Sequence, residues 1–381
     1  MKKILLIRSN PVNPDPPVEK IANTLLGLGY SVTILGWDRS TNGKEERISL
    51  KYPNGQLNKI NLKVKASFGG GIKKNAIPLL LYFNALKKWL KRNIRDFDII
   101  HSFDFDTAAM SYRLSNKYKK KCIYHILDYY ADAHEFGSHR IKKIIMDKEN
   151  SIINSADATI ICSDKRKEQI FGSNPKKLVI IHNTPDHNIV DPNLKVMEAP
   201  VSDKMKIIYV GILAGSRMLK EIAEIVSISD EYELHVGGFG PLEDFFLKMS
   251  SQFSNIYYYG KLPYDKTLAL EHEGDVLVAM YDPTIRNNKY SAPNKFYESL
   301  MIGKPIIMAK NTGFDEIINN YSIGSVTEYS KEGIVYSLKE INNRRNEWDN
   351  ISKVSKKLYK EQFSWCLMES RINDLYSHLS D

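Results

Sequence analysis

A lone acidic residue, Glu298, stands in the otherwise apolar segment that begins at Pro293 and ends at Gly303. We expect this segment to be a helix whose first turn, at Pro293 and Asn294, presents unpaired amide groups and the positive end of the helix dipole to an anion. Glu298 follows about one turn later, where an exposed carboxylate can accept hydrogen bonds from hydroxyls of the same ligand. An anion beside a diol describes a nucleoside diphosphate with its ribose. The structural alternative is a solvated helix with one surface glutamate.

Two glycine-rich turns precede this segment. In the first, an expected strand at 207–210 opens into Gly211 and a loop that carries Arg217 and Lys220. Glycine lets a backbone approach a phosphate closely, and an arginine can bind two phosphate oxygens at once. We therefore assign Gly211, Arg217 and Lys220 to a diphosphate site. An ordinary turn between a strand and a helix is the alternative.

The second turn contains Gly238 and Gly240 and is followed by Pro241, which suits the first position of a helix. We assign both glycines to the same donor-binding region. Neither half of the chain has the G-x-G-x-x-G pattern of dinucleotide-binding oxidoreductases. A nicotinamide-dependent enzyme is therefore not expected.

The elements that must position these residues alternate between short apolar runs and helical stretches, which is typical of parallel sheets with right-handed crossovers. A first series of strands is expected at 4–7, 31–35, 99–100, 121–126, 158–162 and 178–181, and a second at 206–210, 233–236, 256–259, 276–279 and 305–308. We predict two tandem Rossmann-like, doubly wound α/β domains that face a ligand-binding cleft.

The predicted domain boundaries follow from the two series. Residues 1–187 form an acceptor-binding domain and 205–360 a nucleotide-sugar-binding domain, and a proline-containing linker at 185–206 joins them. The last segment, 361–381, is amphipathic and is expected to pack back on the first domain as a helix.

Composition is that of a soluble globular protein, with 381 residues of which 43% are hydrophobic and 26% charged. The apolar run at the start is too short for a signal peptide, and no run approaches the roughly 20 residues of a membrane-spanning helix. We expect a cytoplasmic protein. The three cysteines, Cys122, Cys162 and Cys366, have no metal-binding spacing, so neither a metal site nor a disulfide is expected.

The net charge of +9 is concentrated between residues 72 and 95, which hold seven cations and no acid: Lys73, Lys74, Lys87, Lys88, Lys91, Arg92 and Arg95. Apolar residues, among them Trp89, alternate with these cations. This pattern predicts an amphipathic helix that docks on an anionic membrane, with Trp89 at the interface. The alternatives are an ordinary domain helix with solvated lysines and a polyanion-binding module. No nucleic-acid partner is expected, because known reader modules are absent.

Taken together, these motifs make the chain resemble the GT-B glycosyltransferases, and among them the retaining, nucleotide-sugar-dependent family-4 type. The resemblance runs nearly end to end. Its most specific part is Pro293 to Glu298 followed by Gly303-Lys304-Pro305. The first glycine turn resembles the diphosphate-binding loop of that family, and the second turn resembles its second glycine loop. Asp98 to His101 resembles its strand that ends in an active-site histidine, and Phe363 to Trp365 the start of its returning helix.

The resemblance implies specific roles for these residues. Glu298 would bind the ribose hydroxyls, Arg217 and Lys220 would neutralise the diphosphate, and Asn294 and Lys295 would support it at the helix N-terminus. His101 would contact the transferred sugar or the reacting phosphate. The donor is then a nucleoside diphosphate sugar, with no further cofactor, and the acceptor a glycan or a lipid-linked molecule.

Two positions depart from the family pattern. The glutamate that commonly precedes the ribose-binding one by eight residues is replaced by Tyr290, which becomes a candidate sugar contact, and the usual cation after Gly211 is replaced by Ile212. A non-catalytic, nucleotide-sugar-binding protein of the same fold is therefore the alternative function.

Acidic residues of the first domain complete the candidate site. Asp104 and Asp128 follow expected strands and can orient or deprotonate an acceptor. Asp104 with Asp106 can instead cap the next helix or hold a divalent metal, and Asp128 can be a plain loop carboxylate. His101 can equally be a buried core histidine. A retaining mechanism in which the leaving phosphate helps to deprotonate the acceptor requires no enzymic nucleophile, so none is assigned.

Overall fold

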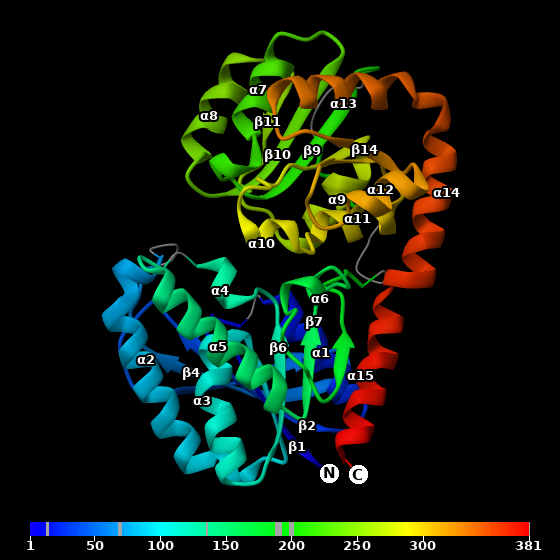
Figure 1. The fold of residues 1–381 in the computed structure, drawn as a ribbon. Coiled ribbons are helices and arrows are strands. Elements are labelled where there is room, and N and C mark those ends of the chain that lie inside the picture. Colours follow the sequence, from blue (N-terminus) through cyan, green and yellow to red (C-terminus); the bar gives the residue numbers. More distant parts are fainter. Residues whose placement is uncertain (13–14, 68–70, 135, 187–192, 198–201, 381) are drawn as a thin grey trace. The chain divides into compact units, whose positions relative to one another are not determined.

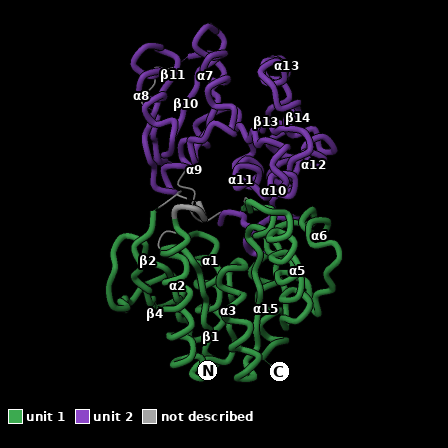
Figure 2. Tube along the Cα trace, turned by 60° about the vertical axis from the view of Figure 1, so that its left-hand side comes forward, with its two compact units in different colours: residues 1–182, 368–381 green, residues 183–367 purple. Residues whose placement is uncertain are grey.

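The chain forms two compact units in a computed structural model. The structure describes residues 1–380 except 13–14, 68–70, 135, 187–192 and 198–201, and of residues 71–74 it describes the backbone but not the side chains. Unit 1 comprises Met1–His182 and Met368–Asp381, and unit 2 comprises Asn183–Leu367 (Figures 1 and 2). Much of the predicted linker at 185–206, and the side chains of Lys73 and Lys74, lie outside the described residues.

Unit 1 is built on an eight-stranded sheet with the strand order β3-β4-β2-β1-β5-β6-β7-β8. The strands are β1 (Lys3–Ile7), β2 (Ser31–Asp38), β3 (Glu46–Tyr52), β4 (Gly55–Lys63), β5 (Ile99–Phe103), β6 (Lys121–Ile126), β7 (Ala158–Ile161) and β8 (Leu178–Ile180). The helices are α1 (Pro16–Gly27), α2 (Gly71–Asn93), η1 (Ile94–Asp96), α3 (Asp104–Lys117), α4 (Tyr130–Ala133), α5 (His139–Ser155) and α6 (Arg166–Gln169).

Most strand pairs of this sheet are parallel, as predicted, and the paired residues of β1 and β5 are buried. Strands covered by helices on both faces must be apolar along their whole length. The exception is the antiparallel hairpin of β3 and β4, which the strand prediction missed. Its turn contains Asn54-Gly55, a strong hairpin signal that should have revealed it.

Unit 2 contains a six-stranded sheet with the order β11-β10-β9-β12-β13-β14. Its strands are β9 (Met205–Ile212), β10 (Tyr232–Phe239), β11 (Ile256–Tyr258), β12 (Val276–Ala279), β13 (Ile306–Ala309) and β14 (Gly324–Thr327). Its helices are η3 (Gly215–Arg217), α7 (Leu219–Ser227), α8 (Glu243–Gln252), α9 (Tyr264–Glu273), α10 (Arg286–Lys289), α11 (Asn294–Ile302), α12 (Asp315–Tyr321), α13 (Lys331–Asn343), η4 (Arg345–Glu347), α14 (Trp348–Leu358) and η5 (Tyr359–Phe363). The predicted pair of doubly wound α/β sheets is confirmed.

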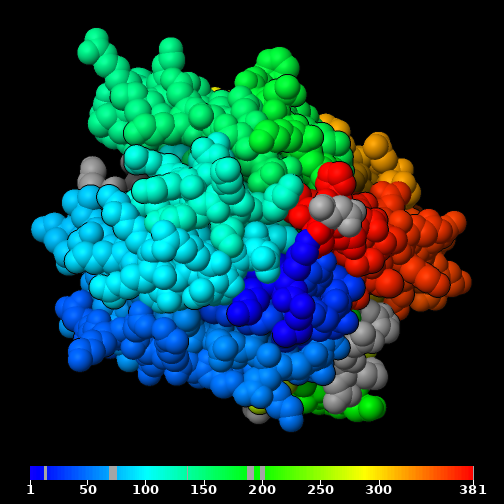
Figure 3. Space-filling view, turned by 90° about the horizontal axis from the view of Figure 1, so that it is seen from below, coloured from blue at the N-terminus to red at the C-terminus, as the bar shows by residue number. Residues whose placement is uncertain are grey.

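The last helix, α15 (Trp365–Ser380), packs on unit 1, as the sequence predicted. The Thr24 hydroxyl on α1 donates a hydrogen bond to Glu369 at 3.0 Å, and the Tyr30 and Ser380 hydroxyls lie 3.3 Å apart. Figure 3 shows this contact, with the red C-terminal helix beside the blue N-terminal residues. The chain therefore ends next to where it begins.

Helix α2 is a domain helix, which was the alternative reading of the basic segment. Trp89 is only 4% exposed and packs with Leu86 and Leu90 in the core of unit 1, so the prediction of an interfacial tryptophan was wrong. Lys87, Lys88, Lys91 and Arg92 are exposed on the opposite face. None of the helices in the described part of the chain, α2 included, is long and apolar enough to cross a bilayer.

Gly238 sits where β10 passes closest to β9. Its φ is 134°, and a Cβ atom at this position would lie 1.8 Å from the carbonyl oxygen of Gly211 on the neighbouring strand. Only glycine allows the two strand ends to come this close. The close approach fixes the geometry of both glycine turns.

Replacing Gly238 by alanine should therefore destabilise unit 2 strongly. The clash involves backbone atoms, so the strands must separate, and we expect a loss of about 3 kcal/mol or more in the free energy of unfolding. Gly215→Ala is the matched control, because a Cβ there meets no atom within 4 Å. Urea denaturation of the two variants measures the difference, and equal stabilities would contradict this account.

Candidate donor and acceptor sites

Lys295, in the first turn of α11, lies under the end of β9. Its Nζ donates a hydrogen bond to the Val210 carbonyl and lies 4.6 Å from the centre of the Tyr209 ring. The side chain is 7% exposed. Burial acts to lower the pKa of Lys295, but the phenol groups of Tyr209 and Tyr281 and two buried carboxylates raise it, with a net upward change. Lys295 therefore keeps its charge at the end of the strand.

Arg217, at the end of η3, brings a second cation to the same place. Its guanidinium stacks on the Tyr281 ring at 3.6 Å, and its Nη1 is buried without a hydrogen-bond partner among the described residues. Burial raises the pKa of the Tyr209 hydroxyl, and Lys295 and Arg217 both act to lower it. The two cations thus share Tyr209 as a neighbour. An unpaired buried guanidinium N–H is a ready donor to an anion.

The remaining donor-site candidates of unit 2 are placed differently. Lys220 on α7 is exposed, and its Nζ lies 5.5 Å from the centre of the Phe245 ring. Asn294 is exposed at the start of α11 and accepts a hydrogen bond of 2.8 Å from Asn183. Tyr290, which follows α10, is only 7% exposed and presents little surface to a sugar. The Gly240 amide donates to Glu243 at 2.8 Å and helps to start α8.

Glu298 is buried rather than exposed, which corrects the expectation of an open carboxylate. It is 3% exposed, and Tyr264 on α9 donates a hydrogen bond to its Oε1 at 3.1 Å. Burial inside the helix layer explains why the neighbouring residues are apolar. The carboxylate lies about one turn after Lys295 on the same helix.

Glu271 on α9 is a neighbour of Glu298 that the sequence did not reveal. It is fully buried, and neither of its carboxyl oxygens meets a donor in the described part of the chain. Burial first, and then the charge of Glu298, raise the pKa of Glu271 well above its ordinary value, which favours a proton on this carboxyl that it can donate to Glu298. Two facing carboxyls form a hydrogen bond only when one holds a proton, so the pair shares one.

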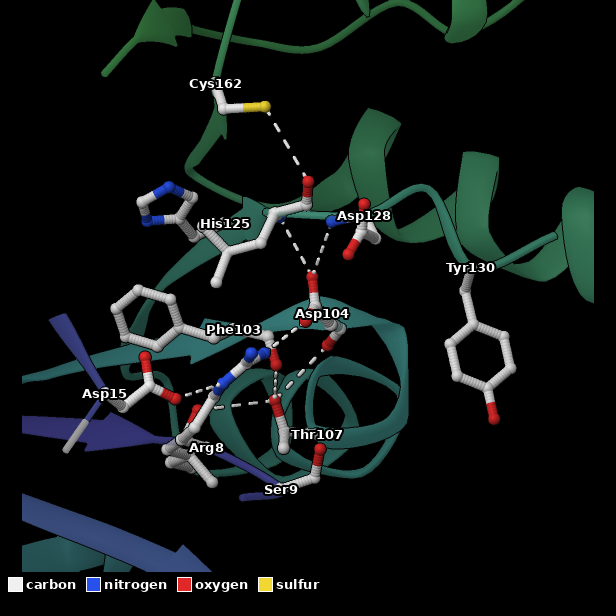
Figure 4. A network of polar contacts seen from close by, with 12 residues as sticks. Arg8, Ser9, Asp15, Phe103, Asp104, Thr107, His125, Asp128, Tyr130 and Cys162 are labelled. Atoms are coloured by element: carbon white, nitrogen blue, oxygen red, sulfur yellow. Dashed lines mark hydrogen bonds and ion pairs between the residues drawn. The ribbon is translucent and has the colours of Figure 1, made fainter. Parts of the chain in front are cut away.

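In unit 1, an arginine that the sequence did not single out gathers the acidic residues. Arg8 follows β1 and pairs with Asp15 at 2.9 Å and with Asp104 (Figure 4). The other Asp104 oxygen accepts the amides of Leu127 at 2.9 Å and Asp128 at 3.1 Å. Asp104, with a φ of 61°, therefore fixes the turn after β6 instead of capping its own helix.

Asp128 is the most exposed acid of this group. Its side chain is 59% exposed and pairs at 3.4 Å with Arg166 of α6, which is itself 1% exposed. Arg166 also donates to Gln169 at 2.6 Å and to the Cys162 sulfur at 3.0 Å. Figure 4 shows the Asp128 side chain beside Asp104. Asp128 thus follows β6 on a turn that charged neighbours hold in place.

Asp106, in the first turn of α3, has an unusual carboxyl group. Its Oδ1 is buried without a hydrogen-bond partner among the residues described. Burial, and secondly the charge of Asp104, raise the pKa of Asp106 to about 6. A carboxylate with this pKa can accept a proton near neutral pH. No cluster of three metal-binding side chains occurs in the described ranges.

His101 is a core residue, which was the structural alternative for it. It has no exposed surface, its Nδ1 lies 2.6 Å from the Tyr376 hydroxyl of α15, and its Nε2 lies 3.2 Å from His125. Burial lowers the pKa of His101 to about 3, so the ring is neutral. Its burial favours the core alternative, and the direct contact with the transferred sugar stays a prediction. It ties β5 to the returning helix.

Comparisons with known proteins agree with this architecture. Residues 18–188 match the family model described as Glycosyltransferase Family 4. A sucrose-phosphate synthase from Thermosynechococcus elongatus superposes with a TM-score of 0.75 at 14% identity, covering 100% of this chain and 99% of that one. The chain is a glycosyltransferase of the GT-B fold. The resemblance and the enzyme class predicted from the sequence, a nucleotide-sugar-dependent glycosyltransferase, are thereby confirmed.

Two further solved structures share the fold of this glycosyltransferase. HepE from Anabaena in complex with UDP-glucose has a TM-score of 0.68 at 12% identity, over 99% of this chain and 100% of that one. A trehalose-6-phosphate synthase studied for glycosyl transfer with retention has a TM-score of 0.69 at 11% identity, over 99% and 98%. No curated protein sequence matches the chain.

The buried carboxyl pair of the glycosyltransferase predicts a pH-dependent stability. Because the pKa of Glu271 is raised in the folded state, the folded chain keeps a proton that the unfolded chain releases. The contribution of Glu271 to stability is therefore largest below its unfolded pKa of about 4.3 and falls as the pH rises from there toward its raised pKa in the folded state. Glu271→Gln supplies an amide donor to Glu298 at every pH. This variant should show a shallower decline than the wild type and gain on the order of 1–3 kcal/mol at about pH 8.

Urea unfolding at a series of pH values between about 4.5 and 8.5 measures this effect. Glu332→Gln, at an exposed position on α13, is the control and should keep the decline of the wild-type protein. Parallel curves for the wild type and Glu271→Gln would show that the pair does not share a proton.

Proposed function

We propose that the chain transfers a sugar from a nucleoside diphosphate sugar to a glycan or lipid-linked acceptor, with retention of configuration and without a metal ion. The observation that carries this proposal is the convergence of Lys295 and Arg217 on Tyr209, beside the N-terminus of α11. Two cations and free helix amides can stabilise the charge that develops on a leaving diphosphate. No metal is needed for that task.

The carboxyl of Glu298 would bind the ribose hydroxyls of the donor. It lies in the same helix as Lys295, so one rigid element would position both the phosphate and the ribose contacts. The complex of HepE with UDP-glucose supports a donor of this class, because that protein shares the fold. A binding screen of UDP, GDP and ADP sugars identifies the nucleobase and the sugar.

Unit 1 would bind the acceptor. Asp106 and Asp128 can accept hydrogen bonds from acceptor hydroxyls, and Asp104 holds the turn that carries Asp128. The work on retention in a trehalose-6-phosphate synthase of the same fold supports the stereochemical outcome. In such a transfer the bond between the anomeric carbon and the phosphate oxygen breaks. The acceptor oxygen attacks the same face, and its proton passes to the departing phosphate.

Arg217→Ala should weaken the binding of the donor by about 10- to 100-fold, because a charge-assisted hydrogen bond to phosphate is lost. Lys248→Ala, which removes an exposed cation on α8, is the control and should leave affinity within about twofold. Isothermal titration with UDP-glucose, GDP-mannose and ADP-glucose identifies the donor and measures both effects. Equal affinities of Arg217→Ala and the wild type for that donor would rule out this phosphate site.

Glu298→Gln should weaken donor binding by about tenfold, because an amide accepts fewer hydrogen bonds from the ribose than a carboxylate. Stability should be kept even though the side chain is buried, because the new amide can donate to Glu271. Titration with the donor and thermal unfolding test the two halves of this expectation. Unchanged donor affinity would refute the ribose contact.

The alternative function, a non-catalytic nucleotide-sugar-binding protein, is favoured by Tyr290. This residue replaces the glutamate common in the family, and it is buried. A binding protein would bind the donor tightly and turn over none of the donor and acceptor combinations. A transferase would release free nucleoside diphosphate in step with the glycosylated acceptor.

We also propose that the protein is cytoplasmic and binds to the inner face of an anionic membrane through α2. The exposed cations Lys87, Lys88, Lys91 and Arg92 support this proposal, since each lysine or arginine near such a surface contributes about 1 kcal/mol. Replacing all four by glutamine should abolish sedimentation with phosphatidylglycerol vesicles, as should high salt. Vesicle binding that persists both in the glutamine variant and at high salt would contradict the proposal.

A further inference from the structure

A groove of about 400 Å³ runs along α3 on the helical face of unit 1. Helix α3 packs against both α2 and α5, and all three contribute to the lining. The walls are mainly apolar, with Phe83 from α2, Ala109 and Met110 from α3, and Ile152 from α5, and Asp106 of α3 is the acidic residue among them. An apolar groove of this size favours a hydrocarbon guest over a polar one.

Two cations mark one end of the groove. Arg113, about 10 Å along α3 from Asp106 at the rise of an α-helix, lines it together with Lys148 of α5. Both side chains are exposed, and neither forms an ion pair with any residue that the structure describes. The aliphatic stems of such side chains lie along apolar surface while their charged ends stay in water. An anion at this end of the groove would meet both charges.

Exposed apolar side chains lie near the groove on two of the helices that line it. Leu80 lies one turn before Phe83 on α2 and is 67% exposed, and Ile144 lies one turn before Lys148 on α5 and is 53% exposed. Nine large hydrophobic side chains are exposed in the described part of unit 1, and five of them belong to these two helix ends: Ile77, Leu80, Leu81, Ile141 and Ile144. Apolar surface that gathers in this way marks an interaction site.

We propose that the groove along α3 holds one hydrocarbon chain of an anionic membrane lipid, with the lipid phosphate between Arg113 and Lys148. The proposal rests on the membrane contact proposed above and gives it a defined binding site. Charge complementarity favours an anionic lipid over a protein partner, because two cations line the groove and α2, which also lines it, carries four more exposed cations. The exposed apolar side chains at the helix ends would enter the acyl region next to the phosphates.

Alkyl phosphates of increasing chain length test the groove without a membrane. Binding of butyl, octyl and dodecyl phosphate to the full-length protein, below their micellar concentrations, is measured by isothermal titration. We expect affinity to rise at least 100-fold from butyl to dodecyl phosphate, because each buried methylene adds to binding. Affinity that does not depend on chain length overturns the proposal.

Two variants locate the chain and the phosphate separately. Ala109→Trp fills the groove and should remove the dependence on chain length, whereas Asn116→Trp, on an exposed position of the same helix, should keep it. Arg113→Ala combined with Lys148→Ala should weaken all three ligands about tenfold and keep the dependence. If Ala109→Trp does not fold, as judged by thermal unfolding, Ser151→Trp on α5 replaces it.

The outcome separates this proposal from the ones on which it depends. Chain-length dependence that survives in a folded groove-filling variant would show that the hydrocarbon binds elsewhere. Concentration-dependent dimerisation that this variant abolishes, without lipid binding by the wild type, would assign the groove to a second copy and overturn the proposal. Donor titration of the same variant should match the wild type, since the donor site lies in unit 2.

Discussion

A cation that leaves water must keep partners that offset its lost hydration, and each unit holds such a cation at the carboxyl ends of its strands. In unit 1, Arg8 lies between Asp15 and Asp104. In unit 2, Lys295 lies between the Val210 carbonyl and the Tyr209 ring. Parallel strands all end at one edge of a sheet, so these partners come from segments far apart in the sequence. The polar loops are therefore held by charge as much as by apolar packing.

The balance of charge around the two cations differs, and this difference separates the tasks of the units. Three carboxyl groups, those of Asp15, Asp104 and Asp106, surround the single positive charge of Arg8. Unit 1 therefore keeps acidic groups that can accept hydrogen bonds from the hydroxyls of a ligand. In unit 2, Lys295 and Arg217 share their surroundings with a carboxyl pair that holds a proton between its members. One positive charge is then in excess, as a phosphate ligand requires. The proton on the pair also keeps an otherwise repulsive contact of two buried acids stable.

What the sequence could predict depended on whether a signal is local. Apolar runs and glycine turns are local, so the parallel strands and the fold followed from them, and Asn54-Gly55 could have revealed the hairpin as well. Burial of single polar residues depends on tertiary packing. For this reason His101, Trp89 and Glu298 were expected at surfaces, although they lie inside. Glu271 and Arg8 carry no motif, and only the pairing of distant elements brings them beside the candidate site.

Helix α2 shows how one packing requirement can create two surfaces. Its inner face must cover the sheet, so Tyr82, Leu86 and Trp89 are buried. The outer face does not pack against the sheet. It changes along the helix axis from apolar at Leu80 and Leu81 to basic at Lys87 and Lys88. In water, exposure of the apolar side chains is unfavourable, and the neighbouring lysines repel one another. A bilayer offers hydrocarbon and phosphate in adjacent layers, so it can stabilise both ends of the same face at once, which a uniformly apolar or uniformly acidic partner cannot do.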